Sequence, residues 1–411
     1  MRVLYRSKLT FSLLMAGALA LGSASAAPKY DKGANDQEVV IGQTFALSGP
    51  VAVEAYQTKV HDGYFRQLNE QGGINGRKIR LITLDDGYSP PRTMEQTRRL
   101  VERDQVLFIA MPFGSPTNAA TQRYLNGRKV PQINVLSGAS RFFDGEGAPW
   151  TTAVLPAYVN EGAVYGQYLQ QLAADPASSL QNPKIGILYQ NDDFGKDYVQ
   201  GLKQALGDRA KEWIVHEASY EPTDPTLDSQ IIALQNSGAN VFMNFSAGRA
   251  TLLSIRKAHE IGWKPLQILD SPWATIDEVL KPAGLEASTG IISSMYLKEP
   301  GDSRWADDPG MQEFLTFMQK YVPDVNPNSR NAALAYLNAA LVAQIIKQAG
   351  DDLTRANIMK QATSLSDVRN PMLLPGVTAS VSETKRSPID QLQIVQFDGS
   401  KWVPKSGIIQ P

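Results

Sequence analysis

Two turns rich in hydroxyl-bearing and small residues follow apolar runs that are typical of buried strands. The segment GSPT at 114–117 comes after the run at 106–110, and SGAS at 137–140 comes after the run at 132–136. Ser115 followed by Pro116 predicts the start of a helix, whose exposed N–H groups and dipole favour a ligand carboxylate. Ser115 could instead serve only to cap the helix. Side by side, the two turns would form a polar floor for a small ligand.

No pattern in the sequence predicts catalysis or metal binding. The three histidines, His61, His216 and His259, are far apart and lack the short spacing of zinc ligands, and the chain has no cysteine. The triplet DFG at 193–195 occurs without any other protein-kinase element, and no Gly-x-Ser-x-Gly motif supplies a serine nucleophile. The segment GGING at 72–76 follows a predicted helix, the reverse of the order in phosphate-binding loops. We therefore expect a protein that is not an enzyme and has no metal or cofactor.

The elements that must position the two turns alternate between apolar runs and amphipathic helical patterns, which predicts an α/β fold with parallel sheets. In the first helix Tyr56, Val60, Tyr64 and Leu68 recur every four residues. Strands are predicted at 39–47, 78–84, 106–110, 132–136, 184–189, 213–217, 241–245 and 266–269, with helices between them. Helices at 311–321, 332–349 and 354–364 and a hairpin at Asp398-Gly399 follow. The alternation restarts after Pro156, so we expect two α/β units in tandem.

The first 26 residues have the pattern of a secretory signal peptide. Three basic residues precede the apolar run at 9–21, and Ala24-Ser25-Ala26 forms a cleavage site. The run is too short for a membrane span, which needs roughly 20 residues. Because the chain has no cysteine, we expect no lipid anchor. Without this segment the net charge is about −4, which does not favour nucleic-acid binding. The signal peptide and the absence of cysteine together predict a freely diffusing periplasmic protein.

Five segments in combination resemble the solute-binding proteins of branched-chain amino-acid ABC transporters. They are IGQTFALSGP at 41–50, NEQGGINGR at 69–77, KVPQ at 129–132, ILYQNDDFGK at 187–196 and PTLDSQ at 225–230. The resemblance covers essentially the whole chain after the signal peptide. It implies the type I periplasmic-binding fold, in which three crossing segments join two doubly wound parallel-sheet lobes that close on a ligand by a hinge. The implied lobes are 36–155 with 293–372 and 156–292 with 373–411, with crossings near Leu155, Ser293 and Leu374.

The resemblance also implies a ligand site. The segment 114–117 matches the turn that holds the ligand carboxylate, and 137–140 matches the neighbouring strand end. In the second lobe Phe194 falls where amino-acid binders often have a tyrosine, and Glu54 replaces a tyrosine at the cleft rim. The candidate ligand-binding residues are Glu54, Gly114, Ser115, Thr117, Ser137, Gly138, Ser140, Phe194, Phe245, Arg249, Ser271 and Trp273.

One departure from the family bears on the ligand. The acidic residue that pairs with the ligand ammonium in amino-acid binders matches Pro272 here, and an unpaired buried charge costs several kcal/mol. We therefore expect an aromatic or branched aliphatic carboxylate without an α-amino group, with Arg249 either a second anchor or a solvated residue. The alternative is a true branched-chain amino-acid receptor that uses Asp270 or Glu54 as the ammonium partner.

The resemblance implies a periplasmic substrate-binding protein of an ABC importer, a monomer that delivers its ligand to an inner-membrane permease. A second function within the same fold is ligand sensing for a membrane signalling protein. Neither function involves nucleic acid.

Overall fold

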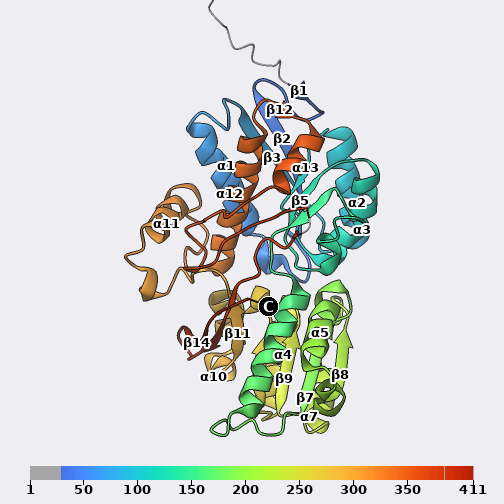
Figure 1. Ribbon diagram of the computed structural model, residues 1–411, viewed down its shortest axis with the longest axis vertical. Helices are drawn as coiled ribbons and strands as arrows, with labels where there is room; N and C mark the ends of the chain where they lie inside the picture. Colours follow the sequence, from blue (N-terminus) through green and yellow to red (C-terminus); the bar gives the residue numbers. More distant parts are fainter. Residues whose placement is uncertain (1–28, 384, 411) are drawn as a thin grey trace, which may run out of the picture.

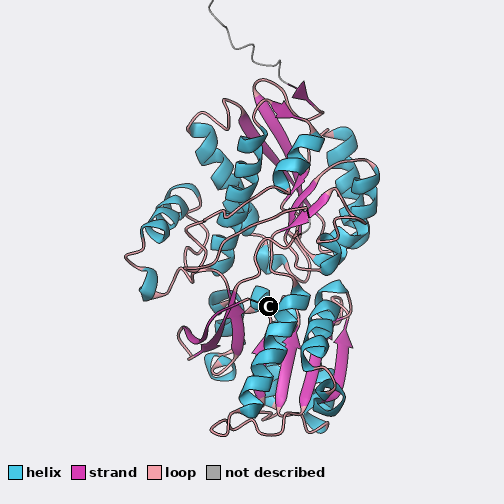
Figure 2. Cartoon of the chain, viewed as in Figure 1, coloured by secondary structure: helices cyan, strands magenta, loops and turns pink. Residues whose placement is uncertain are grey.

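The computed structural model describes residues 29–383 and 385–410, so the predicted signal peptide at 1–26 lies outside the described residues. The chain forms two α/β lobes that lie one above the other in Figure 1, each built on its own sheet. Figure 2 shows helices flanking the strands of each lobe. The predicted fold class, two parallel-sheet lobes, is confirmed.

The first lobe contains a five-stranded parallel sheet in the order β3-β2-β4-β5-β6. The strands are β2 (Glu38–Phe45), β3 (Lys78–Asp85), β4 (Ile109–Ala110), β5 (Gln132–Val135) and β6 (Thr151–Ala153). The helices are α1 (Gln57–Glu70), α2 (Pro90–Arg98), α3 (Ser115–Gly127), α11 (Pro309–Tyr321), α12 (Arg330–Ala349) and α13 (Arg355–Ala362). A separate two-stranded sheet pairs β1 (Lys29–Tyr30) with β12 (Asp352–Leu353). The strand order places the turns after β4 and β5 side by side, because these strands are parallel neighbours.

The second lobe contains a seven-stranded sheet in the order β14-β13-β11-β10-β9-β7-β8. The strands are β7 (Ile185–Gln190), β8 (Ile214–Tyr220), β9 (Val241–Phe245), β10 (Leu266–Leu269), β11 (Ile292–Met295), β13 (Leu392–Phe397) and β14 (Trp402–Ile409). The helices are α4 (Tyr158–Ala174), α5 (Asp193–Leu206), α6 (Arg209–Trp213), α7 (Asp228–Asn236), α8 (Arg249–Glu260), α9 (Lys281–Ala283) and α10 (Leu285–Ser288). Strands β13 and β14 are antiparallel and confirm the hairpin predicted at Asp398-Gly399.

Short 3-10 and π segments interrupt the longer elements. They are η1 (Ala52–Glu54), η2 (Arg99–Arg103), η3 (Ser140–Phe142), η4 (Ser271–Trp273), η5 (Ile276–Leu280) and η6 (Ser303–Trp305). Two of them, η1 and η4, follow the carboxyl ends of β2 and β10.

Both faces of strand β2, in the middle of the first-lobe sheet, are buried, as is typical of parallel sheets. In β2, Val39 and Ile41 belong to the large core cluster, whereas Val40 packs with Leu100 and Ile109 in a smaller cluster on the other face. Successive side chains of a strand point to opposite faces, so this alternation explains why the sheet is covered by helices on both sides. The turns that follow the carboxyl ends of the strands are left to face the other lobe.

Two of the three crossings pair with each other. Lys298 N donates to the Met372 carbonyl at 2.8 Å, and Leu374 N donates to the Tyr296 carbonyl at 2.9 Å. Ser293 still lies within β11, opposite Val395 of β13. We propose lobe limits within a few residues of those expected, with the second crossing slightly later than Ser293.

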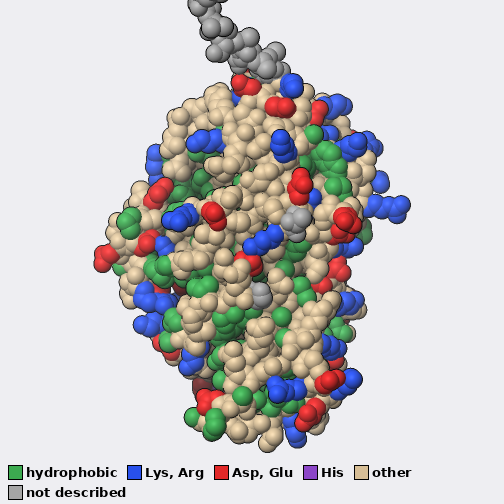
Figure 3. All heavy atoms as spheres, in the orientation of Figure 1, with side chains coloured by type: hydrophobic (Ala, Val, Ile, Leu, Met, Phe, Trp, Pro, Cys, Tyr) green, Lys and Arg blue, Asp and Glu red, His purple; other side chains and the backbone are tan. Residues whose placement is uncertain are grey.

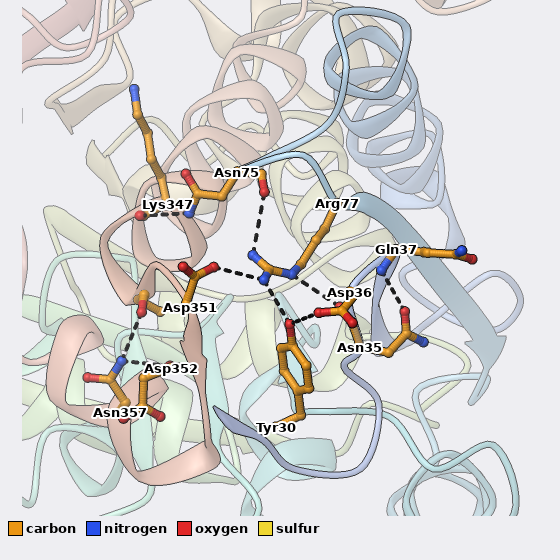
Figure 4. A network of polar contacts seen from close by, with 11 residues as sticks. Tyr30, Asn35, Asp36, Gln37, Asn75, Arg77, Lys347, Asp351, Asp352 and Asn357 are labelled. Atoms are coloured by element: carbon orange, nitrogen blue, oxygen red, sulfur yellow. Dashed lines mark hydrogen bonds and ion pairs between the residues drawn. The ribbon is translucent and has the colours of Figure 1, made fainter. Parts of the chain in front are cut away.

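The glycine-rich segment at 72–77 anchors the far end of the first lobe. Figure 4 shows the guanidinium of Arg77 between Tyr30 and Asp351, whose oxygens both lie 2.8 Å from Nη2. Arg77 is 5% exposed, and it also donates to the Asn35 carbonyl. The segment therefore ties β1 to the end of α12, away from the cleft.

The surface carries charges of both signs. In Figure 3, basic and acidic side chains are interspersed over both lobes of the visible face. None of the helices in the described part of the chain combines the length and apolar character needed to cross a membrane.

Candidate ligand-binding site

A narrow cavity of about 40 Å³ lies between the two lobes, at the carboxyl ends of their strands. Its first-lobe wall is made by Glu54, Gln57, Tyr88, Phe113, Gly114, Ser115, Leu136, Asn331 and Leu334. Leu155 of the first crossing also lines it, and the second lobe supplies Tyr158, Phe194, Ala247, Pro272 and Trp273. The walls are thus mostly apolar, with a few polar groups from the first lobe, as in typical sites for small molecules.

The turn after β4 presents the start of α3 to this cavity. Gly114 has φ 95° and a Cβ there would lie 2.6 Å from the Tyr88 ring, so the position requires glycine. The Gly114 carbonyl accepts hydrogen bonds from Asn118 Nδ2 at 2.7 Å and Thr117 Oγ1 at 3.2 Å. No side chain caps α3. Its first N–H groups have no partner within the helix, and such groups suit an anion.

The second predicted turn supports the first one from behind. Ser137 Oγ lies 2.7 Å from Ser115 Oγ and accepts a hydrogen bond from Ala139 N at 3.1 Å. A Cβ at Gly138 would lie 2.0 Å from the Pro156 carbonyl oxygen, so glycine lets the first crossing pass closely. Ser137, Gly138 and Thr117 do not line the cavity. They hold the residues that do.

Aromatic rings form the second-lobe wall. Tyr158 and Phe194 meet edge to face with centroids 5.1 Å apart, and Trp273 is buried beside them at the cavity. Phe245 does not line the cavity. It is fully buried behind this wall, stacked on Tyr198 at 4.8 Å.

The turn after β10 presents only two of its residues to the cavity, Pro272 and Trp273. Asp270 is fully buried, and its Oδ1 accepts a hydrogen bond from Trp273 N at 3.2 Å. Burial, with the nearby Glu161 carboxylate as the second cause, raises the pKa of Asp270 well above its usual range. Ser271 bonds Glu161 through both its N–H and its hydroxyl. Asp270 and Ser271 therefore fix the turn and do not face the cavity.

Among the residues that the structure describes, Glu54 is the one carboxylate that lines the cavity. It is 1% exposed, and its Oε2 accepts hydrogen bonds from Gln57 Nε2 at 2.6 Å and Asn331 Nδ2 at 3.0 Å. Burial, and secondarily the Glu278 carboxylate, raises the pKa of Glu54 from 4.5 to about 7. This carboxylate comes from the first lobe, opposite the turn after β10.

A family model described as "Periplasmic binding protein" matches residues 38–401. The chain belongs to this family of periplasmic binding proteins. Because the family binds substrates without converting them, the prediction that the protein is not an enzyme is confirmed.

Relatives of this family share low sequence identity with the chain over most of its length. A "Leu/Ile/Val-binding protein homolog 7" of Brucella suis is 22% identical over 372 residues, covering 89% of each chain. A fatty acid ABC transporter substrate-binding protein from Thermomonospora curvata has a TM-score of 0.77 at 20% identity, covering 93% of this chain and 95% of that one. A branched chain amino acid ABC transporter from Thermus thermophilus with bound valine has a TM-score of 0.77 at 16% identity, covering 92% and 98%. The predicted resemblance and the type I periplasmic-binding fold are confirmed.

Two other candidate residues of this periplasmic binding protein lie outside the cavity. Arg249 is exposed and lines a separate groove at the mouth of the cleft, where its N–H donates to the Pro50 carbonyl at 3.4 Å. Ser140 N donates to Asp197 Oδ2 at 2.6 Å and so links the two lobes. The structure brings Glu54, Gly114, Ser115, Phe194 and Trp273 together at the cavity.

Sequence reasoning missed most of the apolar lining and two polar residues. Tyr88 follows the carboxyl end of β3, so the rule that found the turn after β4 could have found it. Gln57 lies one helical turn after Glu54, and no sequence pattern marks it as a ligand-binding residue. Asn331 and Leu334 begin α12, more than 200 residues away in sequence, and only the fold brings them to the site.

Proposed function

We propose that this chain is the substrate-binding protein of an ABC importer, which captures a small carboxylate-bearing ligand with an apolar body between its lobes. The observation that carries the proposal is the uncapped start of α3 at Gly114 and Ser115, which lines an otherwise mostly apolar cavity. A carboxylate fits the N–H groups there, and the aromatic wall covers the apolar body. In support, two similar structures are those of a fatty acid ABC transporter substrate-binding protein and a branched chain amino acid ABC transporter with bound valine.

A second candidate is a true branched-chain amino-acid receptor. It is favoured by Glu54, because a carboxylate in the cavity supplies the anion that Pro272 does not. Asp270 no longer serves as a candidate ammonium partner, since it is fully buried outside the cavity.

We also propose export to the periplasm through cleavage after Ala26. The mature protein then carries no lipid anchor, works as a monomer and delivers its ligand to an inner-membrane permease. The family and the N-terminal sequence pattern support this route. The composition gives no role to nucleic acid.

Calorimetry on ligand-stripped protein tests the carboxylate requirement with probes matched in shape. We expect 4-methylpentanoate or leucine to bind at least about tenfold more tightly than its neutral amide, because charge-assisted hydrogen bonds are the stronger ones. Ser115→Ala should weaken the acid, whereas Ser229→Ala, on the exposed surface of α7, should not. Equal binding of acid and amide, or no binding of either acid, would contradict the proposed ligand class.

Transport is tested in cells with the tightest probe. Deleting the gene should abolish uptake of that acid at low concentration. If uptake is unchanged although the protein binds the acid, the importer role is wrong and ligand sensing takes its place.

A further inference from the structure

A second concave region lies in the second lobe, at the end far from the cleft. It is a groove of about 600 Å³, which we call the distal groove, lined by the last turns of α8, by α10 and by residues at the amino ends of β10 and β11. Over the described ranges, no residue lines both the distal groove and the cavity between the lobes. The two are therefore separate, and the distal groove has the size of a small-molecule site, roughly 300–1,000 Å³.

One buried donor in the distal groove has no acceptor. Gln267 of β10 lines the groove and is 8% exposed, and its Nε2 has no hydrogen-bond partner within residues 29–383 and 385–410. It lies beside Phe242 in the sheet register, and Phe242 packs on Trp263 with ring centroids 5.0 Å apart. Gln396 Nε2, by contrast, donates to the Gly290 carbonyl at 3.1 Å. Because buried polar atoms are nearly always paired, the Gln267 amide points to an acceptor supplied by a ligand.

Two basic side chains of the distal groove also lack partners. Lys264 and His259 are exposed, and neither side chain forms an ion pair or a hydrogen bond with any residue that the structure describes. Lys257 on the same helix differs, because it lies 3.4 Å from each of two carboxylates. Glu286 is the one carboxylate among the described lining residues. The groove therefore offers more free donors than acceptors, which favours a ligand with a negative charge.

The remaining surface of the distal groove is largely apolar. Ile255 of α8 and Ile291, just before β11, are 1% and 2% exposed. The ring of Trp263 is held in place by a hydrogen bond from its Nε1 to the Ala239 carbonyl at 3.0 Å. These side chains form a fixed apolar surface next to the unpaired donors, so the groove suits a ligand that has an apolar body as well as an anionic group.

We propose that the distal groove is a second binding site, which takes a small organic acid with a compact apolar body. Gln267 Nε2 and the Lys264 ammonium bind its carboxylate, with His259 as a third donor, and the body packs on Ile255, Trp263 and Ile291. This site is independent of the cleft and of the ligand proposed for it. A carboxylate is the simplest group that supplies several acceptor positions to donors on different elements.

The test compares acids with their neutral amides by calorimetry on the mature chain. The probes are cyclohexanecarboxylate, adamantane-1-carboxylate and 2-naphthoate, each paired with its carboxamide. We expect at least one acid to bind at least about tenfold more tightly than its amide, as hydrogen bonds to charged groups allow. Gln267→Met, which keeps the length of the side chain, and Lys264→Ala should each reduce this preference to within about threefold.

Two control variants separate the distal groove from general charge effects and from the cleft. Lys184→Ala removes an exposed lysine at the amino end of the same sheet, outside the groove, and should leave the preference unchanged. Ser115→Ala alters the cavity between the lobes and should also leave it unchanged. The proposal is overturned if no acid binds better than its amide, if the preference survives either groove substitution, or if Ser115→Ala removes it. Should Gln267→Met fail to fold, the exposed Lys264 decides alone.

Tryptophan fluorescence locates the bound acid. Adamantane-1-carboxylate and cyclohexanecarboxylate do not absorb where tryptophan emits, so a change in emission reports a ligand close to an indole ring. We expect the change on binding to disappear in Trp263→Phe and to persist in Trp273→Phe, which alters the wall of the cleft. The reverse pattern would place the acid in the cleft and overturn the proposal.

Discussion

The stability of the empty protein should depend on pH through Glu54. Its pKa is about 7 in the folded chain and 4.5 as an ordinary carboxyl, so the folded state holds the proton more tightly than the unfolded state. The resulting stabilisation is complete below about pH 4.5 and is lost as the pH rises through about 7. At 1.36 kcal/mol for each pKa unit, the loss amounts to about 3 kcal/mol.

Glu54→Gln removes this titration and leaves the other groups in place. The free energy of unfolding of the variant, relative to wild type, should therefore increase by up to about 3 kcal/mol between pH 4.5 and pH 8. Buried groups such as Glu299, whose pKa is also raised to about 7, and His61, whose pKa is lowered to about 3, cancel in the difference. Urea titrations followed by tryptophan fluorescence at four pH values measure this difference in the free energy of unfolding.

The control is Glu95→Gln, an exposed residue on α2, whose difference from wild type should stay flat. A flat difference for Glu54→Gln as well would mean that Glu54 titrates normally and is hydrated in the empty cleft. In that case the pKa of Glu54 is not raised by burial. If the protein is an amino-acid receptor that uses Glu54, saturation with leucine should lower the pKa of Glu54 and reduce the pH dependence.

Two further predictions concern the supporting residues. Gly138→Ala should lower the melting temperature and cost about 1–3 kcal/mol of stability, because the new Cβ would lie 2.0 Å from the Pro156 carbonyl oxygen. The control Gly127→Ala, whose Cβ meets open space, should not lower it. Equal melting temperatures for the two variants would show that Gly138 is not tightly packed. Arg249→Ala should leave the affinity of the tightest probe within about twofold by calorimetry, since Arg249 is exposed in the outer groove, and a tenfold loss would place it on the ligand.

The parts of the fold that depend on local sequence were predictable. The four-residue period from Tyr56 to Leu68 corresponds to α1, and the strand predicted at 39–47 corresponds to β2. The short strand β6 was missed because three residues carry no recognisable period. Only Ile109 and Ala110 of the run at 106–110 form β4, although Leu107 N still donates to the Val40 carbonyl.

The direction of side chains on a fully buried strand was not predictable. All residues of β9 are buried, so the sequence lacks the polar and apolar alternation that would reveal which face meets the ligand. Phe245 shares a face with Val241 and Met243 and packs on Tyr198 behind the cavity wall. Arg249, four residues later, starts α8 and faces the outer groove.

Most polar groups that line the cavity come from the first lobe, because the buried carboxyl groups of the second lobe are used within that lobe. Glu161 there accepts hydrogen bonds from the hydroxyls of Tyr165 and Tyr198, both at 2.6 Å, and from Ser271 and Ser294. Both oxygens of Glu161 are therefore occupied, and burial, with the Glu161 carboxylate as the second cause, raises the pKa of its neighbour Asp270 well above the usual range.

The second lobe thus uses its buried carboxyl groups to fix the turn at 270–273 and shows the ligand mainly aromatic and apolar surface. The first lobe carries the start of α3 and Glu54, so in the proposed function it binds the polar part of the ligand before the cleft closes. Closure then removes apolar surface from water against Phe194 and Trp273, a contribution that scales with the area of the ligand body. In the proposed function, the first lobe therefore selects ligands by their polar groups, and the second lobe selects them by the size and apolar character of the rest of the molecule.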